Sequence, residues 1–148
     1  MHFISVIMSG LFGTSAPITS DLNLLLQILI FVLLVVGTKF GRKKTKSSLQ
    51  IHGRIMTVAV GLNAIAILLV MGPSLLLAFN FALEEPVVIG FPLTLVHHSF
   101  GLGAEILGAV LIFRKFGKVR MWMRLNLSLW IVAFALGVLF YLRYFIIG

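Results

Sequence analysis

The sequence predicts an all-α integral membrane protein, a single domain over residues 1–148 that folds as an up-down four-helix bundle. Two observations predict this class. Hydrophobic residues make up 60% of the chain and charged residues only 11%, whereas about a quarter of the residues in soluble domains are charged. The hydrophobic residues also gather in four long stretches separated by polar or basic segments, as in helices that cross a bilayer.

The formal net charge of +8 comes from two clusters of basic residues. Eleven of the twelve Lys and Arg residues lie in residues 39–54 or 114–124, and only Arg143 lies elsewhere. Lys and Arg are enriched in cytoplasmic loops, so we expect both loops to be cytoplasmic and both termini to lie outside. This clustering gives no sign of a nucleic-acid partner. The absence of cysteine excludes disulfides and thiolate metal sites within the chain.

The first predicted span covers residues 22–38, close to the lower limit of about 17 residues for crossing a bilayer. Ser20 or Asp21 is expected to cap the start of this helix, because short polar side chains satisfy the first backbone donors. A short apolar run over residues 3–12 precedes the span. We interpret it as an N-terminal interfacial or re-entrant segment on the outer side.

The second predicted span, residues 52–81, is interrupted by Pro73. Proline lacks a backbone donor, so we expect a kink around residues 70–72, with neighbouring helices covering the freed carbonyl. The third predicted span covers residues 92–113 and the fourth covers residues 122–147. Short loops between the spans favour antiparallel neighbours and hence the up-down topology.

Two polar residues lie deep in the predicted bilayer. With a helical rise of about 1.5 Å per residue, Glu105 lies about 12 Å from the inner end of its span, and Asn63 about 14 Å from the same side. Their depths match, so we predict a buried polar pair joined by a hydrogen bond. A carboxylate at this depth costs several kcal/mol unless it is paired or protonated. Glu105 could alternatively relay protons or balance a bound cation.

Adjacent histidines, His97 and His98, lie within about two turns of the outer end of the third span and are candidate metal ligands. Neutral imidazole binds copper, zinc and haem iron. The alternative is that both are interfacial residues hydrogen-bonded to neighbouring helices. His52, at the inner boundary, is a secondary metal candidate that could instead extend into the headgroup region. It lies about 20 Å from the pair along straight helices, so one ion cannot join both ends.

Glycines and methionines in the spans have simpler interpretations. Gly101, Gly103 and Gly108 permit close helix approach, or alternatively leave room for a flat macrocycle. Thioethers suit copper, but methionine is also a common gap-filler, and we interpret four scattered methionines as packing residues. These are Met56, Met71, Met121 and Met123.

Several of these residues also carry a family resemblance, which extends over about residues 21–145. The segments QIHGRIMTVAVGLNAIAILLVMGPSL and VHHSFGLGAEILG, with KVRMWMRLNLSLWIVAFALGVLFYLRYF, resemble the domain of unknown function 420 family. These CtaM/YozB-like small four-span membrane proteins are linked to haem-copper oxidase maturation. The matching landmarks are His52, Met56, His97, Gly108, Trp130 and Tyr141.

The resemblance implies that His52 and His97 are the polar landmarks of the fold. One departure matters, because the family pattern places a further histidine where this chain has Val119. An inner site that needs both histidines would therefore be incomplete here. This favours the outer pair, His97 and His98, as the better ligand candidates.

The sequence contains no phosphate-binding loop, no HExxH motif and no nucleophile–base set, so no enzyme is predicted. The resemblance implies a non-enzymatic accessory or assembly factor for a copper- or haem-containing respiratory membrane complex. The alternative is a small structural subunit stably integrated in a large membrane oxidase or monooxygenase complex. A b-type haem electron carrier is the least favoured function. Membrane lipids and a larger membrane complex are the expected partners.

Overall fold

The computed structural model describes residues 10–84, 90–113 and 118–147. Within these ranges the regular structure is entirely helical. Four of the helical segments are long and apolar enough to cross a membrane, namely Ile18–Lys43, Lys46–Leu77, Pro92–Phe113 and Val119–Ile147. The predicted fold class, an all-α four-helix bundle of membrane type, is therefore confirmed, and the chain is a multi-pass membrane protein.

All four helices begin earlier in the sequence than predicted, and the first two also end later. The first is α1 (Ile18–Lys43), and the second consists of α2 (Lys46–Ala66), the π-helical turn η1 (Ile67–Met71) and α3 (Gly72–Glu84). The third is α4 (Gly90–Phe113), and the fourth is α5 (Val119–Leu142), which continues into the π-helical turn η2 (Arg143–Ile147). Polar residues at the helix ends keep helical hydrogen bonding, so hydropathy alone underestimates the lengths of these helices.

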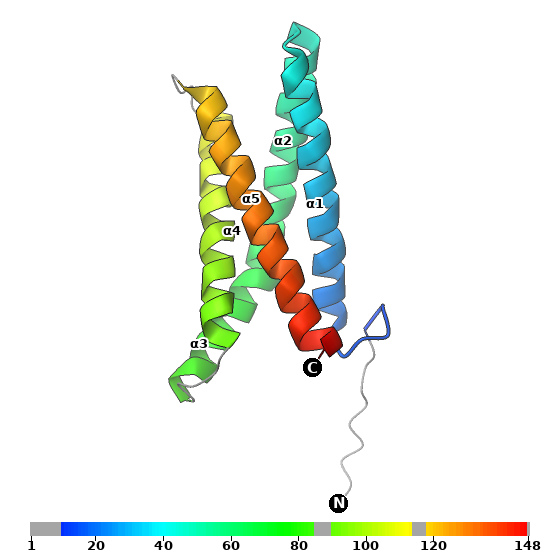
Figure 1. The fold of residues 1–148 in the computed structure, drawn as a ribbon, viewed down its shortest axis with the longest axis vertical. Coiled ribbons are helices and arrows are strands. Elements are labelled where there is room, and N and C mark those ends of the chain that lie inside the picture. Colours follow the sequence, from blue (N-terminus) through cyan, green and yellow to red (C-terminus); the bar gives the residue numbers. More distant parts are fainter. Residues whose placement is uncertain (1–9, 85–89, 114–117, 148) are drawn as a thin grey trace, which may run out of the picture.

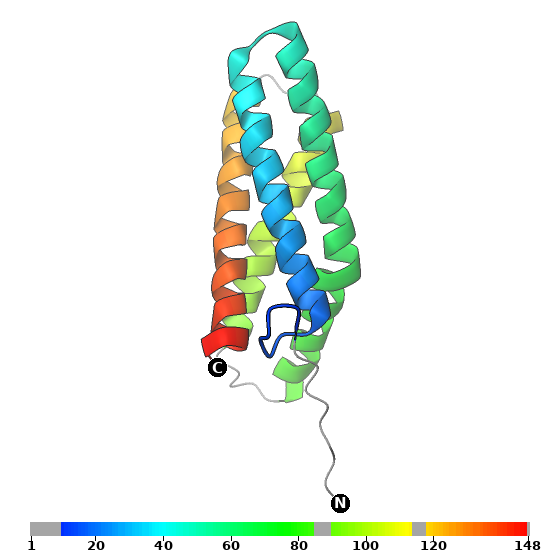
Figure 2. The ribbon, with the colours of Figure 1, turned by 90° about the vertical axis from the view of Figure 1, so that its right-hand side faces the viewer.

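The four long helices run alternately up and down (Figures 1 and 2). The turn between α1 and α2 lies at the same end as the last turn of α4 and the first turn of α5, and we call this the basic end. The start of α1 and η2 lie at the opposite end, which we call the terminal end. Toward the basic end, the α1–α2 pair diverges from the α4–α5 pair (Figure 1).

A tight hairpin joins α1 to α2. Lys44 adopts a left-handed backbone conformation, with φ of 57°, and ends α1. Thr45 then caps α2, because its hydroxyl accepts a hydrogen bond from the Ser48 backbone N–H at 3.2 Å. The Ser48 hydroxyl in turn accepts from the Thr45 backbone N–H, which completes a capping box. This turn places the first basic cluster at one end of the bundle.

The interruption predicted at Pro73 takes the form of the π-helical turn η1. Gly72 N–H donates to the Ile67 carbonyl, five residues earlier, directly before the proline. The widened turn lets the helix pass a residue that cannot donate a hydrogen bond. The adjacent carbonyl of Met71 accepts a hydrogen bond from the Ser74 hydroxyl at 2.8 Å and lies 3.2 Å from His98 Nε2.

The start of α1 differs from the expectation. Pro17 is the residue that caps the helix, and it contributes no side-chain hydrogen bond. Asp21 lies inside the first turn, and its side chain faces the protein interior. Neither Ser20 nor Asp21 caps the helix, so that prediction is wrong. Most of the predicted segment 3–12 lies outside the described residues, and residues 10–16 form turns rather than a helix.

A buried cluster fills the middle of the bundle. Ile30, Ala59 and Ala104 are fully buried, and Leu34 and Trp130 complete the cluster. We call this cluster the central plug. Trp130 lines the space at the terminal end and Leu34 lines the space at the basic end, so the plug lies between the two. These two spaces hold the polar side chains considered next.

Candidate functional site

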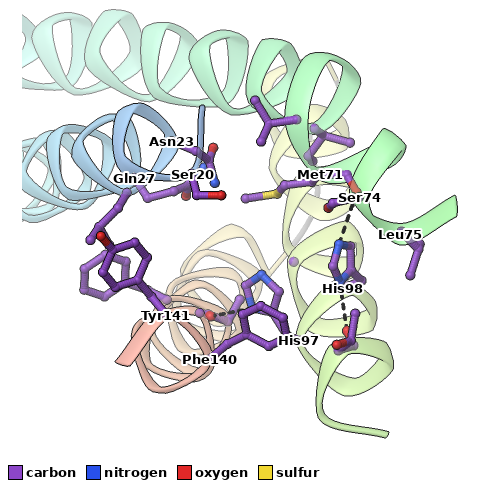
Figure 3. Close-up of a pocket in the computed structure, with 18 of the residues that line it drawn as sticks. Ser20, Asn23, Gln27, Met71, Ser74, Leu75, His97, His98, Phe140 and Tyr141 are labelled. Carbon is purple, nitrogen blue, oxygen red and sulfur yellow. Dashed lines mark hydrogen bonds between the residues drawn. The ribbon is translucent and has the colours of Figure 1, made fainter. Parts of the chain in front are cut away.

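The terminal end of the bundle encloses a cavity of about 330 Å³, which we call the terminal-side cavity (Figure 3). Its wall combines polar groups from all four spans with apolar side chains such as Leu24, Val70 and Phe134. This size is at the lower end of small-molecule sites, which run from about 300 to 1,000 Å³. The polar and sulfur-bearing side chains on its wall include Asn23, Gln27, Met71, His97, His98 and Tyr141.

His97 is anchored to α5. Its Nδ1 lies 2.9 Å from the carbonyl oxygen of Ala133. A carbonyl only accepts, so Nδ1 carries the proton, and Nε2 of the neutral ring keeps its lone pair. Gly137, one turn after Ala133, leaves room for the ring, because a methyl group there would lie 2.9 Å from His97 Cε1. The fold therefore presents His97 Nε2 as an acceptor or metal ligand.

His98 is held differently from its neighbour. Its Nδ1 lies 2.8 Å from the Thr94 carbonyl, and its Nε2 lies 3.2 Å from the Met71 carbonyl (Figure 3). A neutral ring can donate to one of these carbonyls and an imidazolium to both. The two rings are close, with centroids 5.1 Å apart and planes at 86°. Both ring nitrogens of His98 face carbonyls, so His98 links α4 to η1 and offers no nitrogen to a metal in this arrangement.

A series of hydrogen bonds between polar side chains links α1, α2 and α4. Gln27 Nε2 donates to Asn63 Oδ1 at 3.0 Å, and Asn63 Nδ2 donates to Glu105 Oε2 at 2.8 Å. The structure thus brings together the two residues that matched in depth, Asn63 and Glu105, and adds Gln27 from α1. Asn63 is buried at 3% exposure, so both ends of its amide depend on these partners.

A second polar cluster at the terminal end was not anticipated. Asp21 is fully buried, and the Tyr141 hydroxyl donates to its carboxylate at 2.5 Å. The same hydroxyl lies 3.2 Å from the Thr14 hydroxyl, and the Phe12 N–H donates to the second carboxylate oxygen at 3.4 Å. Asp21 starts the first span and Tyr141 ends the fourth. The predicted topology already placed them at one end, which is the signal that could have revealed this pair.

Two buried polar atoms on the wall of the terminal-side cavity have no partner in the described part of the chain. They are Trp130 Nε1, in a residue 4% exposed, and Asn23 Oδ1. One is a donor and the other an acceptor. Leaving each unsatisfied costs about 1–3 kcal/mol. The cavity therefore has polar groups that a bound molecule or a partner could satisfy.

His52 repeats the His97 arrangement at the basic end. Its Nδ1 lies 2.8 Å from the carbonyl oxygen of Gly37 on α1. Gly41, one turn later, faces the ring, because a methyl group there would lie 3.1 Å from His52 Nδ1. His52 therefore does not simply extend into solvent. It lines a separate cleft, the basic-side cleft, which shares no lining residue with the terminal-side cavity.

The glycines predicted to permit close approach divide into two groups. A methyl group at Gly108 would lie 3.1 Å from Val60 Cγ2 on α2, so this glycine does bring α4 close to α2. Methyl groups at Gly101 and Gly103 would meet nothing within 4 Å among the residues that the structure describes, so neither glycine brings two described helices close together and the close-approach interpretation is wrong for both. Gly101 instead lines the terminal-side cavity.

A metal would find few donors from this chain alone. Within the described ranges, no group of three or more His, Asp or Glu side chains comes together. Of the two histidines on the wall of the terminal-side cavity, His97 is the one whose Nε2 is not directed at a carbonyl, and Met71 from η1 lines the same wall. Imidazole and thioether both suit copper. These two donors are fewer than a closed, permanent metal centre requires.

Comparisons with protein-family models, with curated proteins and with solved structures return no match for this chain. The class of protein rests on the fold and the site. It is a four-span membrane bundle with two separate polar spaces, and in each a histidine bonds through Nδ1 to a carbonyl on a neighbouring helix.

Proposed function

We propose that this chain is a non-enzymatic accessory or assembly factor for a copper- or haem-containing respiratory membrane complex. The observation that carries the proposal is the anchoring of His97. Metal-binding histidines usually donate their second ring N–H to a backbone carbonyl or a carboxylate, which sets the tautomer and orients the ring. His97 has this arrangement, with its ring on the wall of the terminal-side cavity.

The incomplete donor set suits transfer of copper to a partner. His97 Nε2 and the Met71 thioether would hold the ion, and the copper would supply the redox centre of the larger complex. An ion with two protein ligands can accept further ligands from a receiving protein. Trp130 and Asn23, with their unsatisfied polar atoms, would orient water or a partner group in the same space.

A stable structural subunit of a large membrane oxidase or monooxygenase complex is the second candidate. Its support is the contact chain from Gln27 through Asn63 to Glu105, which ties three helices together without any ligand. A b-type haem carrier has less support. Two axial imidazoles would be needed at one depth, and the anchored rings of His52 and His97 lie at opposite ends of the bundle.

We also infer the orientation of the bundle. The basic loops, residues 39–54 and 114–124, would face the cytoplasm, and both termini would lie outside. Residues 114–117 lie outside the described residues, but Lys118 and Arg120 continue the second cluster at the start of α5. Cysteine accessibility in intact cells would test this orientation. Labelling of Arg42→Cys and Lys118→Cys from outside would contradict it.

Copper binding by the purified full chain, measured by competition with a chromogenic Cu(I) chelator, tests the cofactor role. His97→Ala is expected to weaken binding by about 10- to 100-fold, the usual effect of disturbing a ligand or its support. His98→Ala is the matched control, and it should change the affinity by less than about threefold because both its nitrogens face carbonyls. Equal copper content in the wild type and both variants would end the metal hypothesis.

Co-purification from native membranes separates the two candidate roles. A fixed stoichiometry with a larger oxidase or monooxygenase, kept through purification, would support the structural subunit. Association found only while the larger complex is being assembled would support the assembly factor.

A further inference from the structure

The basic-side cleft has no role in the copper proposal, and its chemistry is different. It has a volume of about 820 Å³ and opens where the α1–α2 and α4–α5 pairs diverge (Figure 1). Four cationic residues line it. Arg42 and Lys44 come from the end of α1, and Arg120 and Arg124 come from the first turns of α5.

The positive charge in this cleft is not balanced by the protein. None of the described residues that line it is acidic. The chain has four acidic residues in all. Asp21 belongs to the terminal end, Glu84 is the last residue of α3, Glu85 comes next in the sequence, and Glu105 accepts a hydrogen bond from Asn63. All four cationic side chains of the cleft are exposed. A cluster of positive charges without negative neighbours attracts an anion.

Most of the remaining lining is apolar, with His52, Asn126 and two threonines among it. Leu34, Val60, Leu111 and Leu127 extend the wall from the cationic rim toward the central plug. The cleft therefore suits a molecule with an anionic head and an apolar tail. Such a molecule would place its charge at the ends of the helices and its tail at bilayer depth.

Asn126 adds a polar group between the rim and the apolar wall. It follows Arg124 by two residues on α5, and its buried Oδ1 has no partner among the residues that the structure describes. An amide side chain can turn to present either its oxygen or its NH₂ group. At this depth the NH₂ group could donate to an ester carbonyl just below a phosphate.

We propose that the basic-side cleft is a binding site for an anionic phospholipid. The phosphate lies among Arg42, Lys44, Arg120 and Arg124, the ester region lies beside Asn126, and an acyl chain follows the apolar wall. Basic pockets between membrane helices bind lipid headgroups in this way. The charge complementarity of the rim and the apolar depth of the cleft select a phospholipid over a free phosphate, which would leave the wall unfilled.

The test uses the full chain, purified in mild detergent and incubated with phosphatidylglycerol or phosphatidylcholine. Bound lipid is measured by native mass spectrometry. The wild type is expected to retain phosphatidylglycerol in preference to phosphatidylcholine. The double variant Arg42→Gln/Arg124→Gln removes one cation from each side of the cleft. At about fivefold per cationic side chain, phosphatidylglycerol affinity should fall about 25-fold.

A matched control removes the same charge from the same end. Lys43→Gln/Arg54→Gln alters two exposed residues that do not line the cleft. It should change phosphatidylglycerol affinity by less than about fivefold. Equal losses in the two double variants would show diffuse attraction to a positive end and would overturn the proposal. A wild-type protein with no preference between the two lipids would also overturn it. So would a wild-type protein whose native mass spectrum shows bound haem and no bound lipid.

A second variant tests the apolar wall without changing any charge. Leu111→Trp fills part of the cleft, and its helical content and elution volume would show whether it folds. It is expected to lower phosphatidylglycerol retention by about tenfold, as for one or two buried methylene groups. A folded Leu111→Trp protein with unchanged retention would show that the lipid lies outside the cleft, and the site would be rejected.

Discussion

The two polar spaces of this bundle share one arrangement of a histidine, a carbonyl and a glycine, but they differ in size and in the side chains that line them. In each, a histidine directs Nδ1 to a carbonyl on the neighbouring helix and packs on the glycine one turn further along. His52 uses Gly37 and Gly41 of α1, while His97 uses Ala133 and Gly137 of α5. The basic-side cleft is large and cationic, whereas the terminal-side cavity is small and mainly apolar, and its polar groups are uncharged.

The difference shows how the same anchored imidazole can serve different chemistry. Anchoring determines which ring nitrogen is available, and the surroundings determine what can approach it. Around His97 the thioether of Met71 and the unsatisfied Trp130 and Asn23 favour a small cation or a polar group. Around His52 four cationic side chains oppose a metal ion and favour an anion.

The largest effect is expected between the two spaces, at Asn63. Asn63→Leu removes the donor to Glu105 and the acceptor for Gln27 together, and it leaves a carboxyl group unpaired at bilayer depth. We expect a loss of about 3 kcal/mol in the free energy of unfolding. Denaturation in mixed micelles measures it. Asn63→Leu/Glu105→Leu should recover much of the loss, and a double variant as unstable as the single one would contradict the pairing.

At the terminal end, Tyr141→Phe removes the hydroxyl that donates to the fully buried Asp21 carboxylate. The expected cost is about 2 kcal/mol, because a buried acceptor loses a charge-assisted bond. The turn over residues 10–16 should also become more sensitive to protease, since Thr14 bonds to the same hydroxyl. Phe145→Leu, which leaves the hydroxyl in place, is the control. Unchanged stability and cleavage in Tyr141→Phe would show that the bond contributes nothing.

Gly137 and Gly41 each leave room for a histidine ring, and comparing Gly137→Ala with Gly41→Ala tests this role. The methyl group would lie 2.9 Å from His97 Cε1 in the first variant and 3.1 Å from His52 Nδ1 in the second. Each should destabilise the bundle by about 1–2 kcal/mol through overpacking, with the larger loss at Gly137. Gly61→Ala is the control, because its methyl group would meet nothing within 4 Å. Equal stability in all three variants would show that the glycines do not position the rings.

The smallest effect is expected at His98. His98→Ala removes the contact between α4 and the Met71 carbonyl in η1. Hydrogen bonds between membrane helices contribute about 0.6 kcal/mol on average and at most about 1.7 kcal/mol. The thermal midpoint should therefore fall by only a few degrees. Ser99→Ala is a matched control on the same helix, since its hydroxyl bonds within α4. A loss of stability as large as that expected for Asn63→Leu would show that His98 has a larger structural role than its contacts support.

Sequence reasoning predicted the helices and their antiparallel order, because hydropathy and length determine which segments can cross a bilayer. Counting helical rise was also sufficient to match Asn63 with Glu105, since depth depends only on position along a helix. It did not predict Gln27 as the third member, because helix rotation depends on side-chain packing. Asp21 was interpreted as a cap, since a sequence does not show where the chain before a helix turns.

The histidines show a second reason for the incomplete prediction of the site. Their positions placed His97 and His98 at one end and His52 at the other, as the structure has them. The role of each ring depends on side-chain rotation and on which backbone carbonyl faces it. These features arise only after helices pack. They distinguish His97, which has one ring nitrogen beside a carbonyl, from His98, which has both ring nitrogens beside carbonyls.

The most direct test of the anchored-imidazole arrangement is the nitrogen-15 spectrum of the histidine rings in the bilayer-embedded protein. The chain has four histidines, so single substitutions assign each signal. We expect His97 and His52 each to carry a proton on Nδ1, and the Nε2 signal of His97 to shift when Cu(I) is added. A proton on Nε2 of His97, with a bare Nδ1 beside the Ala133 carbonyl, would contradict the anchoring and the ligand role proposed from it.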